Sequence, residues 1–354
     1  TRTVFDMDDP QFLRAKPHPG RREVTAYVTV MKGCDERCTF CIVPYTRGAE
    51  RYRPADQIVG EIRDLVRGGV REITLLGQTV NSWHEPGADA EASRAESRVA
   101  ASTSRFAGLL RRIAKDVPDL WRLRYTSPHP RHITSELLAA HAELDVLASH
   151  VHLPVQSGSD RLLRRMARRY TAAQYIERTD GLKAAKPGLT LSADFIVGFP
   201  GETEEDFEQT LELVRRVGFV AAFAFKYSPR PYTPALKLGD EVAEEVKDDR
   251  LARLFALVET RQQAHLQSLV GREVQVLVEG RSPGDTGRFA GRSERNEIVH
   301  LIAPEGHDPT GELVTVTIDE PFRHSLSGYM TGAHGLGDHG PRTRLSVLGA
   351  GGAA

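Results

Sequence analysis

Cysteine is rare in this chain of 354 residues, which contains three. A disulfide framework needs an even number of cysteines spread along the sequence, so a disulfide-rich secreted fold is excluded. Long apolar runs and a signal peptide are also missing, which argues against a membrane-spanning helix and favours a cytoplasmic protein. No charge of one sign dominates, because 47 Lys and Arg residues face 48 Asp and Glu residues. Any nucleic-acid surface must therefore be local.

The three cysteines, Cys34, Cys38 and Cys41, have the spacing C-x3-C-x2-C. A structural zinc site normally combines four N or S ligands in paired C-x2-C units, and this spacing does not match that pattern. Three thiolates on one short loop instead suit a cubane iron–sulfur cluster with one iron left open for a substrate or cofactor. The alternative is a zinc knuckle completed by a histidine such as His84 or His129.

Apolar and β-branched segments alternate with helical segments over residues 25–227. Strands are expected at residues 25–31, 72–76, 121–125, 150–153, 190–197 and 221–227. Helices are expected after Pro54, around 109–113 and 135–141, on either side of Tyr170, and at 204–217, where Thr203 and Asp206 resemble a capping box. This alternation predicts an α/β fold with a partial, TIM-like (β/α)6 barrel. The cysteine loop would lie at the C-terminal mouth of that barrel.

Composition predicts the units on either side of this core. Proline and charge mark a linker before it, and a run of Glu, Lys, Arg and Leu predicts a helical connection after it. Short apolar strands separated by turn residues then predict a small all-β barrel. The expected units are a linker at residues 1–22, the core at 23–240, a helical connection at 241–268, the small barrel at 269–331 and a disordered tail at 332–354. A flexible insertion is expected between residues 85 and 105.

Several expected strands run into polar or glycine-rich turns that would face the mouth of the barrel. Gly77 lets the backbone approach a ligand, and the amide of Gln78 follows it. In the segment 126–130, two prolines present His129, a candidate catalytic residue whose commoner role would be structural. The turn that contains Gly198 gives similar backbone access beside a ligand.

A fourth turn contains Gln156 and Ser157, which suit hydrogen bonds to a ribose or a carboxylate. Five arginines follow it with spacings of three and four, namely Arg161, Arg164, Arg165, Arg168 and Arg169. We expect most of them on one helix face. An all-arginine face beside the mouth suits phosphate contacts, and a solvated face without function is the equal alternative.

Together these segments resemble the methylthiotransferase branch of the radical S-adenosylmethionine (SAM) enzymes. Besides the cysteine spacing with Phe40 before its last cysteine, the matching segments are residues 43–48, 75–78, 126–130, 153–160, 194–202 and 228–235. Tyr232 departs from the pattern, since glycine is frequent there in the family. The resemblance covers residues 22–330 and likens the small barrel to the RNA-binding TRAM domain of that family.

The resemblance implies one 4Fe-4S cluster in this chain, with Cys34, Cys38 and Cys41 as its catalytic ligands and SAM on the open iron. An electron from a donor such as flavodoxin or ferredoxin would then generate a 5′-deoxyadenosyl radical. Cofactor contacts are implied for Phe40, Gly77, Gln78, Gln156, Ser157, Asp194, Gly198 and Pro200. Among these, Gly77 and Gln78 would meet the amino group of SAM.

For the substrate, the resemblance implies a tRNA anticodon stem-loop in which carbon 2 of N(6)-dimethylallyladenosine at position 37 receives a methylthio group. Residues implied in RNA contact are Tyr45, Arg47, Arg161, Arg164, Arg165, Arg168 and Arg292. Residues 268–324 hold six Arg against ten Asp or Glu, so RNA contacts of the TRAM-like unit would depend on local groups such as Arg288, Arg295 and Arg323. A monomer is expected.

Family members bind a second cluster on three cysteines of an N-terminal domain, and that cluster supplies the sulfur. This chain has no further cysteine and begins inside the expected linker. We therefore expect a fragment that binds SAM and forms the radical without completing sulfur insertion. The open alternatives are a methylthiotransferase for threonylcarbamoyl-adenosine in tRNA or for an aspartate of a ribosomal protein, and a non-catalytic zinc-bearing RNA-binding protein.

Overall fold

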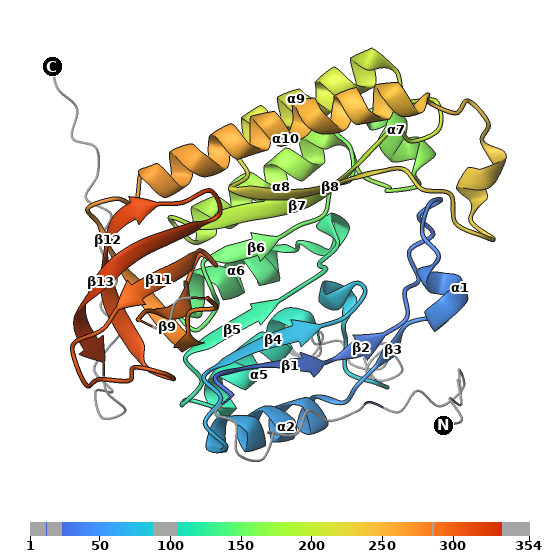
Figure 1. The fold of residues 1–354 in the computed structure, drawn as a ribbon. Coiled ribbons are helices and arrows are strands. Elements are labelled where there is room, and N and C mark those ends of the chain that lie inside the picture. The colour runs from blue at the N-terminus through green and yellow to red at the C-terminus, as the bar shows by residue number, and fades with distance from the viewer. Residues whose placement is uncertain (1–11, 13–22, 88–104, 285–286, 335–354) are drawn as a thin grey trace, which may run out of the picture.

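The computed structural model describes residues 12, 23–87, 105–284 and 287–334 (Figure 1). Nearly all of the expected linker lies outside this part, as do most of the expected insertion and most of the expected tail. Of the helices within the described ranges, none is both long enough and apolar enough to cross a membrane.

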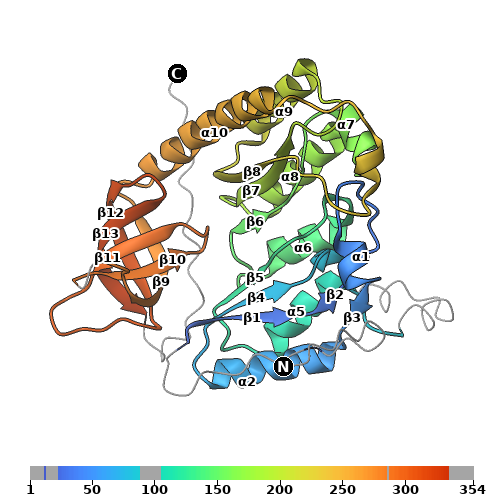
Figure 2. The same ribbon diagram turned by 45° about the vertical axis from the view of Figure 1, so that its right-hand side comes forward.

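The core of the fold is an open barrel of six parallel strands in two three-stranded sheets (Figures 1 and 2). One sheet contains, in this order, β1 (Thr25–Thr29), β4 (Glu72–Leu76) and β5 (Arg122–Tyr125), and the other contains β6 (His150–His152), β7 (Thr190–Val197) and β8 (Ala221–Lys226). The backbone of Leu123 in β5 links them, because it donates to Val146 O at 2.7 Å and accepts from Ala148 N at 3.0 Å just before β6. The predicted partial (β/α)6 barrel is confirmed.

Helices cover the outer side of the two sheets (Figure 1). They are α2 (Ala55–Arg67), α5 (Phe106–Asp116), α6 (Ser135–Glu143), α8 (Ala172–Ala185) and α9 (Glu204–Val217). The short helices α1 (Val43–Arg47), which buries none of its residues, and α7 (Asp160–Arg165), whose last carbonyl accepts from Thr39, lie near the cysteines. In α2, Ile58, Ile62 and Leu65 recur at helical spacing and are buried in the core. The expected capping box opens α9, where the Thr203 and Asp206 side chains each accept a backbone N–H of the other residue.

Short elements connect the larger ones at the mouth of the barrel. They are the hairpin β2 (Met31–Lys32) and β3 (Arg51–Tyr52), and the 3₁₀ helices η1 (Val80–Ser82), η2 (Pro130–His132) and η3 (Pro234–Lys237). Each lies in or beside a segment that the sequence singles out, so the candidate site is built mainly from these connections.

A second unit follows the long helix α10 (Glu244–Gln267), which lies within the stretch expected as a helical connection. It is a closed β-barrel with the strand order β10–β11–β13–β12–β9. Its strands are β9 (Glu273–Arg281), β10 (Phe289–Ser293), β11 (Ile298–Ile302), β12 (Leu313–Pro321) and β13 (Ser325–His334). The apolar pattern predicts only β9, β11 and β12. β13 also extends to His334, inside the stretch expected to be a disordered tail.

A buried ion triad attaches this small barrel to the core. Glu72, at the start of β4, accepts from Arg122 Nη1 at 3.0 Å and from Arg124 Nε at 2.9 Å, and all three side chains are buried. The same guanidinium groups donate to the backbone carbonyls of residues 292–294, at the end of β10, at 2.8–3.2 Å. Burial alone would raise the pKa of Glu72, but the two guanidinium groups outweigh it and lower that pKa.

The turn between β10 and β11 also contacts the second sheet. Arg295 Nε donates to Gly188 O at 2.9 Å, and Thr190 Oγ1, at the start of β7, donates to Arg295 O at 3.4 Å. Because Glu72 and Thr190 are the first residues of their strands, the small barrel covers the N-terminal end of the parallel sheets. The cysteine loop follows β2, at the opposite end, and Figure 2 shows this separation.

His141 in α6 makes the stability of the fold sensitive to acid. It is 2% exposed, its Nε2 lies 2.7 Å from Tyr125 Oη, and burial lowers its pKa from 6.5 to about 3. The unfolded histidine binds a proton near pH 6.5, whereas the folded one stays neutral, so the stability it contributes is present above pH 6.5 and lost as the pH falls toward 3. We expect the wild type to lose about 2 kcal/mol more unfolding free energy than His141→Asn between pH 7 and pH 5. Urea denaturation at both pH values measures this, and equal losses would contradict it.

Candidate active site

The cysteine loop, residues 33–41, is held in one backbone conformation where it leaves β2. Gly33 has φ +76°, and a Cβ there would lie 2.0 Å from the backbone O of Ala49. Only glycine fits this close approach. Cys34 N donates to Gly48 O at 3.2 Å, which ties the start of the loop to the segment after α1.

The end of the loop is fixed by the opposite side of the barrel. Thr39 N donates to Met166 O at 3.1 Å, and Thr39 Oγ1 donates to Arg165 O at 2.9 Å. Ala235 N, in η3, donates to Thr39 O at 2.9 Å. The loop therefore spans the mouth between the two sheets.

The three thiols lie in different surroundings. Cys34 Sγ lies 3.0 Å from Thr79 Oγ1, and the buried Cys38 Sγ accepts from Arg168 Nη1 at 3.5 Å. Burial raises the pKa of Cys34 to about 11 and also raises the pKa of Cys41. These two thiols are therefore protonated at neutral pH in the metal-free chain, and a metal that binds them must displace protons.

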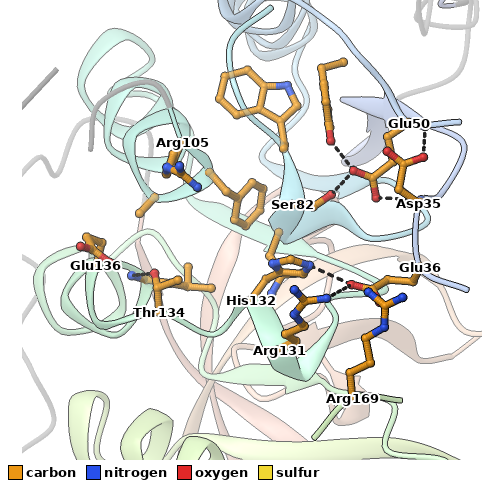
Figure 3. Close-up of a pocket in the computed structure, with 16 residues that line it drawn as sticks. Asp35, Glu36, Glu50, Ser82, Arg105, Arg131, His132, Thr134, Glu136 and Arg169 are labelled. Atoms are coloured by element: carbon orange, nitrogen blue, oxygen red, sulfur yellow. Dashed lines mark hydrogen bonds and ion pairs between the residues drawn. The ribbon is translucent and has the colours of Figure 1, made fainter. Parts of the chain in front are cut away.

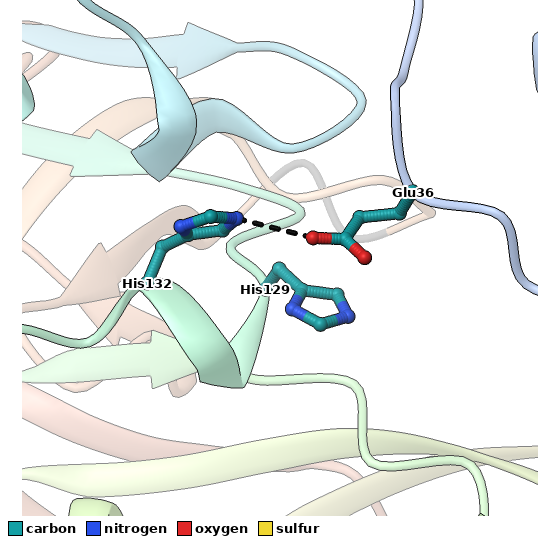
Figure 4. Close-up of side chains that lie close together, drawn as sticks. All are labelled: Glu36, His129 and His132. Carbon is teal, nitrogen blue, oxygen red and sulfur yellow. Dashed lines mark hydrogen bonds and ion pairs between the residues drawn. The ribbon is translucent and has the colours of Figure 1, made fainter. Parts of the chain in front are cut away.

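The described residues contain one compact group of metal-ligating side chains, and the cysteines do not belong to it. Glu36, His129 and His132 have ligand atoms within 4.8 Å of one another (Figure 4). Zinc bonds of ~2.3 Å would place tetrahedral sulfur ligands about 3.8 Å apart, so the three sulfurs are not gathered as one zinc ion requires. The zinc-knuckle alternative finds no support in the described part of the chain.

Glu36 lies between Cys34 and Cys38 in the cysteine loop and contacts several basic side chains. The sequence motifs do not predict these contacts. Its Oε1 lies 3.2 Å from His132 Nε2 and 3.5 Å from Arg131 Nη1, and Arg169 points toward it as well (Figure 3). The hydrogen bond to His132 lowers the pKa of Glu36 against the effect of burial. A metal ion here would compete with the guanidinium groups, so we interpret the group as an ion pair that holds the cysteine loop.

A cavity of about 820 Å³ adjoins this contact (Figure 3). Residues of the cysteine loop line it together with η1 and the first residues of α5 and α6. The sequence motifs do not predict this cavity, because its lining comes from elements that are separate in sequence.

The turn after β4 approaches the cysteine loop closely. A Cβ on Gly77 would lie 2.5 Å from Met31 Cγ and 3.1 Å from Val80 Cα, so the backbone packs tightly there. Gln78 Oε1 is buried and has no hydrogen-bond partner. An unpartnered buried acceptor is costly, and a donor from a ligand would satisfy it.

His129 is fixed by the neighbouring Asn81, a residue that the sequence does not single out for this role. Asn81 Oδ1 accepts from His129 N at 2.7 Å, and its Nδ2 donates to His129 O at 3.0 Å. The imidazole is buried, its Nδ1 accepts from Arg131 N at 3.3 Å, and its Nε2 has no partner. Burial, assisted by the nearby Arg168, lowers the pKa of His129 to about 2, so the ring is neutral at physiological pH. A catalytic role for His129 stays a prediction.

The two predicted cofactor residues in the turn after β6 lie in different surroundings. Gln156 has φ +78°, and its backbone bonds to Asp194 O and Ile196 N at 2.9 Å, which places it beside the end of β7. Ser157 is fully buried, with its hydroxyl 3.3 Å from Thr210 Oγ1 of α9. The structure therefore corrects the expectation for Ser157, because its side chain faces α9 and not the mouth.

The end of β7 carries the remaining predicted cofactor residues. Asp194 is partly exposed, with Oδ1 3.2 Å from His152 Nε2. Gly198, at φ +68°, donates to Glu202 Oε2 at 2.6 Å, and Arg250 of α10 donates to the same oxygen at 2.9 Å. The buried ion pair between Glu202 and Arg250 of α10 therefore fixes the turn that contains Gly198.

Phe40 and Pro200 lie around the same turn. The Phe40 ring meets that of Phe199 edge to face, with centroids 6.5 Å apart. Pro200 is buried, so any contact it makes with a ligand needs some movement of its neighbours.

The profile of the Radical SAM superfamily matches residues 28–214. A tRNA-2-methylthio-N(6)-dimethylallyladenosine synthase of Sorangium cellulosum is 58% identical over 344 residues, which cover 94% of this chain and 69% of the relative. One of Acidithiobacillus ferrooxidans is 48% identical over 319 residues, which cover 90% of this chain and 67% of that relative.

The chain belongs to this family of radical SAM enzymes. Among solved structures, the radical SAM methyltransferase TsrM of Kitasatospora setae has a TM-score of 0.47 at 18% identity and covers 60% of this chain and 38% of TsrM.

Membership of the radical SAM superfamily implies a 4Fe-4S cluster and SAM. The donor set fits the cluster, because three thiols share one fixed loop and Cys38 already accepts a hydrogen bond from a cation. The unpartnered Gln78 Oε1 is an acceptor for a group such as the amino group of SAM. Cys34, Cys38 and Cys41 would thus hold the cluster, and Gly77 and Gln78 would adjoin SAM.

The prediction that one helix of this radical SAM enzyme carries all five arginines is wrong. α7 ends at Arg165, and the φ angles of Ala167 (+57°) and Arg169 (+55°) turn the chain away from helical geometry. Arg161 forms an ion pair with Asp206, and Arg165 pairs with Asp240 at 2.9 Å. Arg168 is buried, so the expectation that it contacts RNA is corrected, whereas Arg164 and Arg169 are exposed.

Tyr45 and Arg47 lie on the exposed surface of α1, next to the cysteine loop. Tyr45 is 49% exposed, and its ring centroid lies 6.4 Å from that of Tyr232, which is 79% exposed. Tyr232 has φ +66°, in the left-handed region, which explains why glycine is the more usual residue there.

The candidate RNA-binding arginines of the small barrel are tied to other parts of the protein. Arg292 Nε lies 3.5 Å from Glu279 Oε1, Arg295 donates to Gly188 O, and Arg323 Nε donates to Glu259 Oε1 at 2.7 Å. The turn at residues 292–294 is also the attachment to the core. Arg292 belongs to β10, which takes part in this attachment, and Figure 2 shows β10 on the other side of the molecule from α1, the helix that follows the cysteine loop.

Proposed function

We propose that this chain carries the radical SAM chemistry by which a methylthio group is added to carbon 2 of N(6)-dimethylallyladenosine at position 37 of tRNA. The observation that carries this is the cysteine loop at the mouth of the barrel, in a chain 58% identical to a synthase named for that product. One 4Fe-4S cluster per chain, SAM and an electron donor such as flavodoxin or ferredoxin belong to the proposal.

The residues of the chain have separate tasks in this scheme. When bound, the cluster and SAM supply a 5′-deoxyadenosyl radical. Cys34 and Cys41 release their thiol protons as the cluster binds, since burial has raised their pKa values. Gln78 Oε1 would accept from the amino group of SAM. Gln156, which bonds to β7, would make further contacts together with Asp194 and Gly198.

The exposed pair Tyr45 and Tyr232, with Arg47 beside them, is the proposed place of RNA contact at the mouth. Aromatic rings stack on unpaired bases, and a nearby guanidinium binds phosphate. Arg164 and Arg169 would extend this contact. We do not extend it to Arg168, and the barrel arginines contribute mainly by positioning the small barrel.

We also propose a division into a core at residues 23–240, a helical connection at 241–268 and a TRAM-like unit at 269–331, in a monomer. A cluster on thiolates needs a reducing compartment, so the proposed location is the cytoplasm.

The test is to delete the gene and measure the modified nucleosides of tRNA by mass spectrometry. We expect loss of the 2-methylthio form and accumulation of N(6)-dimethylallyladenosine. Loss of the methylthio form of threonylcarbamoyl-adenosine instead would assign the substrate to the first alternative. An unmethylthiolated ribosomal protein aspartate would assign it to the second.

A further inference from the structure

Arg168 is a buried cation whose hydrogen-bond partners are all uncharged or sulfur. It is 6% exposed, and among the described residues no carboxylate lies within ion-pair distance of it. Its Nε donates to Tyr170 Oη at 2.9 Å, its Nη2 to Pro154 O at 2.7 Å and its Nη1 to Cys38 Sγ at 3.5 Å. A guanidinium keeps its proton, so the positive charge stays in the interior.

The other buried arginines of the described part show what Arg168 lacks. Arg53 pairs with Glu61, Arg122 and Arg124 share Glu72, and Arg250 pairs with Glu202. An unpaired buried charge costs several kcal/mol, which is why these groups have carboxylate partners. Arg168 needs a negative charge that the residues described by the structure do not supply, and its guanidinium donates to a predicted cluster ligand, Cys38.

The local backbone is shaped to bring this side chain inward. Ala167 and Arg169, on either side of Arg168, have φ values of +57° and +55°, and Arg168 N donates to Leu163 O at 2.9 Å. Tyr170 Oη in turn donates to Val155 O at 3.0 Å, which holds the acceptor for Arg168 Nε in place. Two strained residues that flank one position are maintained only where the surrounding structure requires them.

We propose that Arg168 is the counter-charge of the iron–sulfur cluster and raises its reduction potential. This rests on the cluster of the proposed function. Each reduction adds one negative charge to the cluster, and a fixed cation near a ligand sulfur, away from water, stabilises the reduced state more than the oxidised one. Arg168 is thus a positioning residue for electron transfer, and it acts through Cys38 without contact to the substrate.

The test is an anaerobic redox titration of the reconstituted protein without tRNA, followed by electron paramagnetic resonance. In Arg168→Met the ratio of reduced to oxidised cluster at a fixed potential should fall at least tenfold. This corresponds to a reduction potential lowered by about 59 mV for a one-electron couple. Arg168→Lys, which keeps the charge, should restore most of the shift. Arg215→Met, which removes an exposed cation of α9 outside the proposed site, is the control and should leave the potential unchanged.

Two results with these variants would contradict the role of Arg168 as counter-charge. A wild-type potential in Arg168→Met with full iron content would overturn it while leaving the proposed methylthiotransferase function intact. An equal shift in Arg168→Lys would also overturn it, since shape and not charge would then matter. Arg168→Met could also fail to bind the cluster, in which case Arg168→Lys is the deciding variant. A cluster retained at the wild-type potential in Arg168→Lys would support the role of Arg168 as counter-charge, and a lost cluster would refute it.

Discussion

Cys34→Ala is expected to abolish cluster assembly and, with it, the dithionite-dependent cleavage of SAM to 5′-deoxyadenosine. The chain has three cysteines, all in the loop, so no other thiol can replace the missing ligand. After anaerobic reconstitution we expect about four irons per wild-type chain and almost none in the variant. Iron analysis and chromatography of the cleavage products measure both effects.

Thr79→Val is the matched control for this experiment. Thr79 Oγ1 lies 3.0 Å from Cys34 Sγ, so the variant removes the hydrogen-bonding partner while the thiol ligand stays. It should keep its iron and its cleavage activity. A Cys34→Ala protein with full iron and cleavage would contradict the assignment of the cluster ligands, and stoichiometric zinc in the wild type would contradict the enzymatic interpretation.

Elements whose ends are determined by local chemistry could be predicted from the sequence. α9 and β7 have the expected bounds because a capping box begins the helix and an apolar β-branched run makes the strand. β10 and β13 could not be predicted in this way, since they are rich in Gly, Ser and Thr. They are strands because neighbouring strands of the barrel hydrogen-bond to them on both sides, β9 and β11 in the case of β10, and β11 and β12 in the case of β13.

The same distinction between local sequence and tertiary contacts applies to the candidate site. Three cysteines at a fixed spacing identify their own loop, but the roles of nearby polar residues depend on tertiary contacts. Ser157 belongs to the interior because Thr210 of α9 meets it, and Arg168 is buried because the chain turns inward at Ala167. Glu36 belongs to no motif. Its contacts with Arg131 and His132 could not be predicted, because they form only where the loops after β2 and β5 meet in the fold.

Glu72→Gln is expected to destabilise the protein by ~3–5 kcal/mol, because it removes the carboxylate from a buried triad and leaves two guanidinium groups without a counter-charge. Arg122 and Arg124 also donate to the carbonyls of residues 292–294, so their displacement should loosen the attachment of the small barrel. Urea denaturation at pH 7 measures the stability, and faster proteolysis between the core and the small barrel would report the lost attachment.

Glu143→Gln is the matched control, since Glu143 accepts from Arg111 Nε at 2.8 Å on the surface, where its side chain is 52% exposed. Exposed pairs contribute little to stability because water solvates both charges. The comparison therefore isolates burial, as both substitutions remove the same charge from an arginine pair. If Glu72→Gln costs no more than Glu143→Gln, the triad does not hold the small barrel. The N-terminal ends of the sheets would then need another attachment, for which the contacts of Arg295 with Gly188 and Thr190 are the candidates.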